Sequence, residues 1–164
     1  MQQQKQRKAR RMGWMLAIVG VGAAFAAAVV LLSWRRPELG IQDGRLRPCG
    51  ERPNCVCSHA AAGDSAIAPL SLDGDAKTEF RRLKNIVSRM PGARLIEDGP
   101  DYLRFEFSTP IMHYVDDVEF LLDADSGIIH VRSASRVGYS DMGANRQRVE
   151  AIRERFEQPT GQGG

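Results

Sequence analysis

The sequence lacks the short motifs that mark several large enzyme classes. It has no Gly-rich phosphate-binding loop, no His-Glu-x-x-His zinc motif and no Gly-x-Ser-x-Gly nucleophile elbow. It contains only three His, which are scattered along the chain and indicate no catalytic dyad. Because no activated nucleophile or acid–base pair can be assembled from these residues, the sequence favours a non-enzymatic protein.

Acidic residues are missing from positions 1–36, and charge of either sign is missing from positions 12–34. As a helix, Met12–Trp34 would be about 35 Å long, enough to cross a hydrocarbon core of about 30 Å. Trp14 and Trp34 lie near its ends, where indole rings favour the membrane interface. We therefore expect one transmembrane helix over residues 12–34. A cleaved signal peptide is the alternative, although the apolar run continues through Val29–Leu32 after its alanines.

The charges on the two sides of this helix indicate its orientation. Five Lys and Arg lie in residues 1–11, expected to be a basic cytoplasmic tail, and only Arg35 and Arg36 follow the span directly. The positive-inside rule then places the rest of the chain outside the cytoplasm, which is the periplasm if the cell is Gram-negative. The remaining 16 basic and 20 acidic residues give residues 37–164 a net charge of −4, which argues against a nucleic-acid partner. The expected partners are the membrane, through this one N-terminal helix, and either an envelope protein or a small polar ligand.

After the span, irregular sequence gives way to regular patterns. Residues 35–64 are rich in Pro and Gly and are expected to form a linker and a Cys loop. Residues 65–158 are expected to form one extracytoplasmic domain, and residues 159–164 a disordered tail. The hydrophobic periodicity predicts a weak edge strand, two helices and four strands, in the ranges Ser65–Leu72, Asp75–Met90, Met142–Glu157, Ala93–Glu97, Tyr102–Ser108, Val118–Leu122 and Ile128–Ala134. Short hairpin links favour an α+β fold, with an antiparallel sheet of four to five strands and two packing helices.

Charged residues alternate with apolar ones along three of these strands. If the apolar residues point inward, the opposite face carries Arg104, Glu106, Asp117, Glu119, His130 and Arg132. We expect a solvated face with cross-strand ion pairs, and a concave face that binds a polar ligand is the alternative. Asp116 has the other phase and would point inward, where it needs a partner.

Polar residues are also concentrated between the last strand and the last helix. Ser140 or Asp141 is expected to cap that helix, and Arg146 and Arg148 are expected to be surface charges. The apolar stripe of the helix, extended backwards by four residues, reaches Asn145. A buried amide must be hydrogen-bonded, so we expect a polar network that locks the helix to the strand end at 133–136, to the preceding loop or to Asp116.

The same residues could instead shape a ligand site. The candidates are Asp116, Arg132, Arg136, Asp141, Asn145 and Arg146. Two of them, Arg136 and Arg146, lie near the N-terminus of the last helix and could bind an anion there. A common pocket lined by Asp116, Arg132, Arg136 and Asn145 would favour ligand binding or catalysis. The enzymatic alternative is an envelope hydrolase that uses Asp116, Asp141 and the Arg cluster.

Three segments resemble a known family. They are RPCGERPNCVCS (Arg47–Ser58), VDDVEF (Val115–Phe120) and HVRSASRVGYSDMGANRQRVEAIRERF (His130–Phe156). They are similar to DUF1499, a bacterial and plastid family of domains of unknown function, over most of residues 45–157. The resemblance implies a small α+β domain, often secreted or membrane-tethered, and no established activity. The family usually carries Ser at the position of Cys57.

The three Cys lie within nine residues of each other. Outside the cytoplasm nearby thiols tend to pair, and the family resemblance favours a Cys49–Cys55 disulfide. Pairing through Cys57 is one alternative. Another is a metal or redox module that adds His59 to the three Cys, but the spacing C-x5-C-x-C-x-H is not a common zinc pattern, so we expect no metal and no other cofactor.

Overall fold

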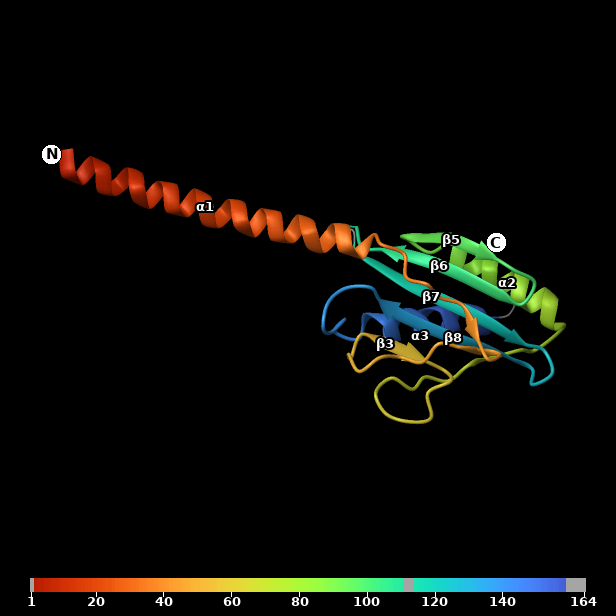
Figure 1. Ribbon diagram of the computed structural model, residues 1–164. Coiled ribbons are helices and arrows are strands. Elements are labelled where there is room, and N and C mark those ends of the chain that lie inside the picture. Colours follow the sequence, from red (N-terminus) through yellow and green to blue (C-terminus); the bar gives the residue numbers. More distant parts are fainter. Residues whose placement is uncertain (1, 111–113, 159–164) are drawn as a thin grey trace.

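The structure is a computed structural model that describes residues 2–110 and 114–158, with the backbone alone over residues 2–11. A long N-terminal helix leads into one α+β domain (Figure 1). The tail expected to be disordered, residues 159–164, lies outside the described residues.

Helix α1 (Gln2–Ser33) contains the apolar stretch found in the sequence. Its segment Met12–Ser33 is long and apolar enough to cross a membrane, and its most apolar part has no buried residue. Phe25, for example, is 72% exposed. Within the described residues this is the one helix of that kind.

The domain is built on a six-stranded antiparallel sheet in the order β3-β8-β7-β6-β5, with β4 also paired to β8. The strands are β3 (Cys55–Cys57), β4 (Leu70–Ser71), β5 (Ala93–Asp98), β6 (Tyr102–Ser108), β7 (Val115–Asp123) and β8 (Ile128–Ser135). The predicted α+β class is confirmed. The sheet gains a strand because β3, in the segment expected to be a linker, pairs with β8 from Cys55 opposite Ala134 to Cys57 opposite Arg132.

Helices α2 (Ala76–Ser88) and α3 (Ala144–Glu157) pack on one face of this sheet. Their apolar stripes join the apolar residues of β6, β7 and β8 in one core, in which Phe105, Phe120 and Ile152 are fully buried. Each such side chain contributes about 1.5–3 kcal/mol on leaving water.

The ends of α2 follow from local sequence. The Asp75 carboxylate accepts a hydrogen bond from the Thr78 amide at 2.9 Å, as expected for an N-cap. After the helix, Gly92 has φ +77°, and a Cβ there would lie 2.5 Å from the Ser108 carbonyl oxygen. Only glycine fits this approach of the turn to β6.

The opposite face of the sheet is covered by the residues that follow α1. This segment, residues 34–46, includes the short hairpin of β1 (Ile41–Gln42) and β2 (Arg45–Leu46). The Gly40 amide donates to Glu119 at 3.0 Å, and Leu46 packs with Tyr102 and Leu121. In Figure 1 the segment runs along the sheet from the end of α1. The expected linker at 35–64 is therefore in large part a folded layer of the domain.

Candidate functional site

The charged face of the sheet is buried, which contradicts the solvated face expected from the sequence. Glu119 is 0% exposed and Asp117 1%, and the segment of residues 34–46 covers this face, where its Gly40 amide donates to Glu119. We call this group the charged cluster; it comprises Arg104, Glu106, Asp117, Glu119, Arg132 and Arg136. The expected cross-strand ion pairs are present within it: Arg104 with Asp117 at 2.9 Å and Arg132 with Glu119 at 2.8 Å.

Arg136 lies at the centre of the charged cluster. Its Nε donates to Asp117 Oδ2 at 2.7 Å, and its Nη2 donates to Glu106 Oε1 at 2.7 Å. Its Nη1 donates to the Ser33 carbonyl oxygen at 3.2 Å, which joins the cluster to the last residue of α1. Burial alone would lower the pKa of Arg136, but these two carboxylates outweigh it and raise the pKa.

Glu106 accepts hydrogen bonds from three guanidinium groups, those of Arg36, Arg94 and Arg136, at 2.7–2.9 Å. Burial alone would raise the pKa of Glu106, but these bonds outweigh it and lower the pKa to about 2. The carboxylate is therefore ionised at any physiological pH and fully engaged in ion pairs.

Glu119 forms the second centre of the cluster. It accepts from Arg132 Nη1 and from the Tyr102 hydroxyl, both at 2.8 Å. Burial and this carboxylate raise the pKa of Tyr102. Arg132 Nε is the one buried side-chain nitrogen or oxygen without a hydrogen-bond partner among the described residues.

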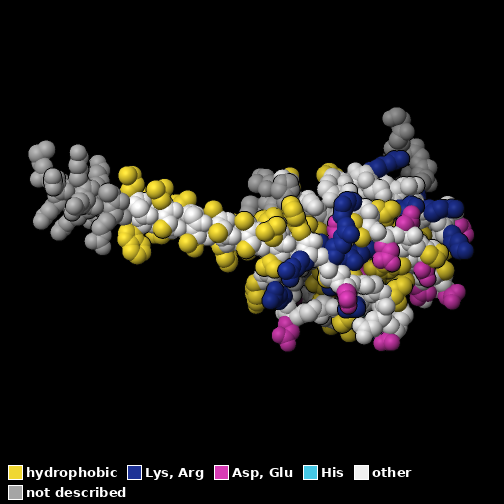
Figure 2. Space-filling view, turned by 45° about the horizontal axis from the view of Figure 1, so that its top comes forward, with side chains coloured by type: hydrophobic (Ala, Val, Ile, Leu, Met, Phe, Trp, Pro, Cys, Tyr) yellow, Lys and Arg dark blue, Asp and Glu magenta, His cyan; other side chains and the backbone are white. Residues whose placement is uncertain are grey.

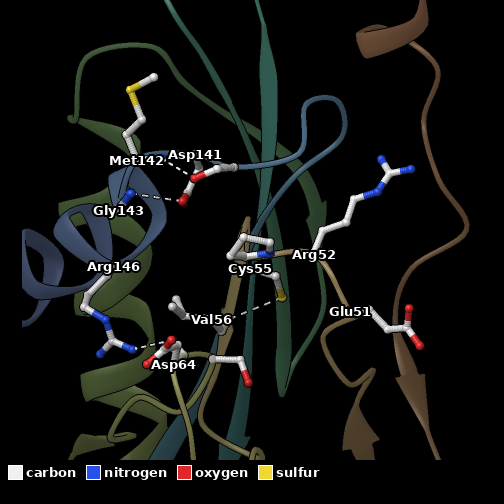
Figure 3. Close-up of a pocket in the computed structure, with 13 residues that line it drawn as sticks. Glu51, Arg52, Cys55, Val56, Asp64, Asp141, Met142, Gly143 and Arg146 are labelled. Carbon is white, nitrogen blue, oxygen red and sulfur yellow. Dashed lines mark hydrogen bonds between the residues drawn. The ribbon is translucent and has the colours of Figure 1, made fainter.

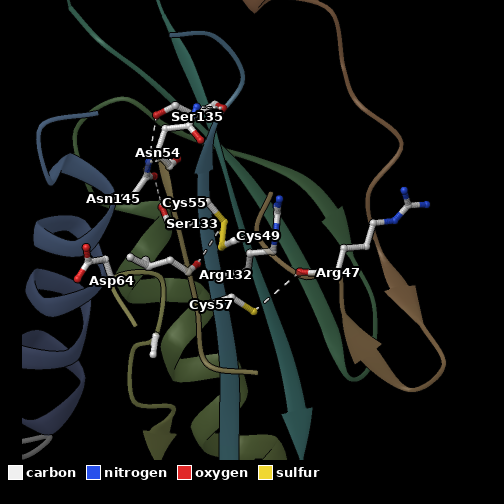
Figure 4. The surroundings of a disulfide bond; sticks show 12 residues. Arg47, Cys49, Asn54, Cys55, Cys57, Asp64, Arg132, Ser133, Ser135 and Asn145 are labelled. Atoms are coloured by element: carbon white, nitrogen blue, oxygen red, sulfur yellow. Dashed lines mark hydrogen bonds between the residues drawn. A yellow bond between two sulfur atoms is a disulfide. The ribbon is translucent and has the colours of Figure 1, made fainter. Parts of the chain in front are cut away.

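On the opposite, helix-covered face, Asn145 forms the buried polar network that the sequence predicted (Figure 4). Its Oδ1 accepts from Ser133 Oγ at 2.5 Å and from Arg148 Nη1 at 2.7 Å. Its Nδ2 donates to the Asn54 carbonyl oxygen and to Ser135 Oγ, both at 3.0 Å. The strand-end partners were expected. Asn54 was not, because β3 was not predicted.

Asp116 points to the same face, as expected, and pairs with Arg148. Arg148 also lies over the Phe107 ring, 5.0 Å from its centroid. The prediction that Arg148 is a surface charge is therefore wrong. Its side chain is only 13% exposed and bridges Asp116 and Asn145.

The six candidate ligand residues do not share one pocket. Asp116 and Asn145 lie on the helix-covered face, whereas Arg132 and Arg136 belong to the charged cluster on the other face. The strand alternation that set Asp116 apart from Asp117 also separates these pairs. The common pocket considered from the sequence is therefore excluded.

The remaining candidates, Asp141 and Arg146, lie at the start of α3. The Asp141 carboxylate accepts from the amides of Gly143 at 3.0 Å and Asn145 at 2.8 Å. Burial raises the pKa of Asp141, but these amides outweigh it and lower the pKa. The N-cap position is Gly143 rather than Ser140 or Asp141, yet Asp141 supplies the capping acceptor. Its carboxylate therefore fills the position at the N-terminus of α3 where a bound anion would otherwise lie.

Arg146 is half-buried rather than a free surface charge. It donates to the carbonyl oxygens of Asp64 at 2.9 Å and Ala66 at 2.7 Å. These bonds attach α3 to the loop before β4.

Between the Cys loop and the start of α3 lies an open cleft of about 550 Å³ (Figure 3). One wall is the loop Gly50–Pro53, and the other is Ser140–Gly143 with Arg146. Cys55 and Val56 of β3 lie between them. In Figure 3 the side chain of Met142 points away from the cleft.

The disulfide that the family resemblance favoured, Cys49–Cys55, is present, with its Cα atoms 5.6 Å apart (Figure 4). Cys57 is a buried free thiol, and burial raises its pKa. The disulfide uses two of the sulfurs that the metal alternative requires, so this observation argues against it.

The stacked imidazoles of His59 and His130 were not predicted from the sequence. The ring centroids of His59 and His130 are 3.8 Å apart, and Ser58 Oγ lies 3.1 Å from His130 Nδ1. Burial, together with His130 and Arg45, lowers the pKa of His59 to about 4, and burial lowers that of His130. The register that pairs Cys57 with Arg132 also brings residue 59 to residue 130, so knowledge of the β3–β8 pairing would have revealed this contact.

A family model described as "Protein of unknown function (DUF1499)" matches residues 45–156. No curated protein and no solved structure matches the chain. The matched range runs from β2 to α3, so it contains the Cys loop, the Asn145 network and the charged cluster. It contains neither α1 nor Arg36 and Gly40, which bind the charged cluster from outside it.

Proposed function

The chain belongs to the DUF1499 family, and from this premise we propose that it is a membrane-anchored, non-enzymatic binding or structural protein of the cell envelope. Its domain lies on the extracytoplasmic side. The observation that carries the proposal is the attachment of the domain to the end of its own apolar helix, through Arg136 to Ser33 and through Arg36 to Glu106.

This attachment is what a fixed membrane-proximal domain requires. A freely jointed tether would leave residues 34–46 in water, whereas here they cover a charged face that would otherwise be solvated. The five basic residues before the apolar stretch support an N-terminus in the cytoplasm.

The states of the carboxylates support a non-enzymatic role. A hydrolase using Asp116 and Asp141 would need one of them free to move a proton. Asp116 is instead paired with Arg148, and Asp141 is held by two backbone amides that lower its pKa. Both side chains stabilise the fold.

The cleft beside the disulfide supports the binding role. Its volume of about 550 Å³ suits a small polar ligand or a segment of an envelope protein. The Cys49–Cys55 bond and the hydrogen bond from Asn54 Nδ2 to the Gly138 carbonyl oxygen, at 3.0 Å, hold its two walls at a fixed separation.

A reporter fused to the C-terminus tests the membrane topology. An enzyme active only outside the cytoplasm should be active in this fusion, and a reporter that needs the cytoplasm should be inactive. The matched control replaces the five basic residues of positions 1–11 by Gln, which should reduce the external activity by weakening the positive-inside bias. Activity only inside the cell would refute the extracytoplasmic placement.

A further inference from the structure

Two apolar side chains project from the loop of residues 136–143, which joins β8 to α3. Tyr139 is 75% exposed and Met142 is 93% exposed, and neither belongs to a hydrophobic core cluster. Met142 also has φ +53°, a left-handed conformation that is uncommon for a residue with a side chain. Apart from Ile41, they are the only exposed large hydrophobic residues described after Trp34.

The β8–α3 loop lies at the end of the sheet where the domain meets α1. Its first residue, Arg136, donates to the carbonyl oxygen of Ser33, the last residue of the apolar segment. In Figure 1 this loop projects beside the end of α1. The turn between β7 and β8 lies at the other end, about 25–30 Å away along the nine residues of β7.

We propose that the β8–α3 loop contacts the surface of the bilayer that holds α1, with Tyr139 and Met142 among the headgroups and upper acyl chains. This inference rests on the proposed membrane anchor. The bond between Arg136 and Ser33 sets the base of the loop at the depth of the span's end, where Trp34 is 57% exposed. Aromatic side chains with a polar tip favour this layer of a membrane.

The charge at this end is compatible with a lipid surface. Exposed charges of both signs lie here, Arg35 and Arg52 together with Glu38 and Glu51, so no excess of one sign repels the headgroups. Figure 2 shows hydrophobic and basic side chains together where the helix meets the domain. Because residues Ser140–Gly143 of the same loop form one wall of the cleft beside the disulfide, the proposed placement sets that cleft next to the bilayer surface.

Tryptophan quenching in vesicles tests the contact on the full chain. The two native tryptophans, Trp14 and Trp34, are replaced by Phe, and Tyr139→Trp provides a single reporter. The chain is reconstituted into phosphatidylglycerol/phosphatidylcholine vesicles in which the acyl chains of the phosphatidylcholine carry bromine. Asp125→Trp, in the exposed β7–β8 turn, is the matched control, and a variant that retains only Trp14 reports the span itself.

The contact predicts that bromolipid removes most of the emission at position 139 and leaves the emission at position 125 unchanged. Quenching of Trp14 without quenching at position 139 would overturn the contact while the anchor stands, and would leave a protein partner as the occupant of the loop. If Trp14 also escapes quenching, the anchor fails, and the inference fails with it.

Discussion

Asn145 and Arg136 lie on opposite faces of the same end of the sheet, and each joins segments distant in sequence. Asn145 connects α3 to β8 and to Asn54 before β3. Arg136 connects β6 and β7 to the end of α1. Polar side chains with several partners therefore hold the layers together at the end of the domain nearest α1.

Replacing Asn145 by Leu should lower the free energy of unfolding by at least about 1–3 kcal/mol, because it leaves Ser133, Arg148 and the Asn54 carbonyl oxygen short of partners. Urea unfolding of the chain in detergent measures the loss. Gln147→Leu, on the exposed side of the same helix, is the control. Equal stability of the two variants would show that the network contributes nothing.

Replacing Arg136 by Met should cost more, about 3–5 kcal/mol, because two buried carboxylates lose a common cation. The loss should shrink as the pH falls, because protonating Glu106 reduces the excess negative charge that the missing guanidinium group leaves in the charged cluster. Unfolding of Arg136→Met and of the exposed-site control Arg155→Met is compared at neutral and acidic pH. A loss that is the same at both pH values would contradict the ion-pair explanation.

Acid should destabilise the domain in two stages. The pKa of His59 is about 4 in the folded chain and 6.5 ordinarily, so the unfolded chain takes up the proton first and stability falls between pH 6.5 and 4. The pKa of Glu106 is about 2 against 4.5, so its contribution is complete above pH 4.5 and is lost towards pH 2. Melting temperatures across this range should fall less steeply above pH 4.5 in His59→Gln. An unchanged slope would refute the stacked-histidine explanation.

At the scale of the elements, the sequence predicted those with a clear period and missed those without one. The stripes of α2 and α3 and the alternation in β6 to β8 identified the regular elements to within a few residues. Strands β1 to β3 have two or three residues each, between Pro and Gly, which is too short for a period to emerge.

The same limit explains the error at the charged cluster. Alternation correctly placed Glu106, Asp117 and Glu119 on one face of the sheet, but it cannot tell whether that face meets water or another layer. Asn145 was recognisable because an amide interrupted an apolar stripe. The buried position of Arg148 was not recognisable, because the strand alternation places Asp116 on the inward face without indicating which cation pairs with it.

The Cys loop gives a prediction about thiols. The folded, unreduced chain should show no reactive thiol, because Cys57 is fully buried and burial raises its pKa. After unfolding it should show one, and Cys57→Ala should show none. Two or more thiols in the unfolded, unreduced chain would exclude the Cys49–Cys55 bond.

Cys49→Ser should lower the free energy of unfolding by about 2 kcal/mol, as expected for opening so short a loop.

At the scale of the whole molecule, the sheet has two differently built sides. One buries an apolar core under two helices, and the other buries ion pairs under the residues that lead from the apolar helix. Because that second cover is also the connection to α1, the domain cannot swing away from the helix end without breaking the bonds to Glu106 and Glu119. We therefore expect a domain held close to the membrane in one orientation.

Hydrogen exchange of residues 37–46, in the full chain reconstituted in lipid vesicles, tests this account most directly. The Gly40 amide donates to Glu119, and the hairpin of β1 and β2 pairs within the segment, so these amides should exchange far more slowly than those of an unstructured peptide. Exchange at the rate of an unstructured peptide, with β6 to β8 still protected, would show that the segment is a free linker and contradict the account.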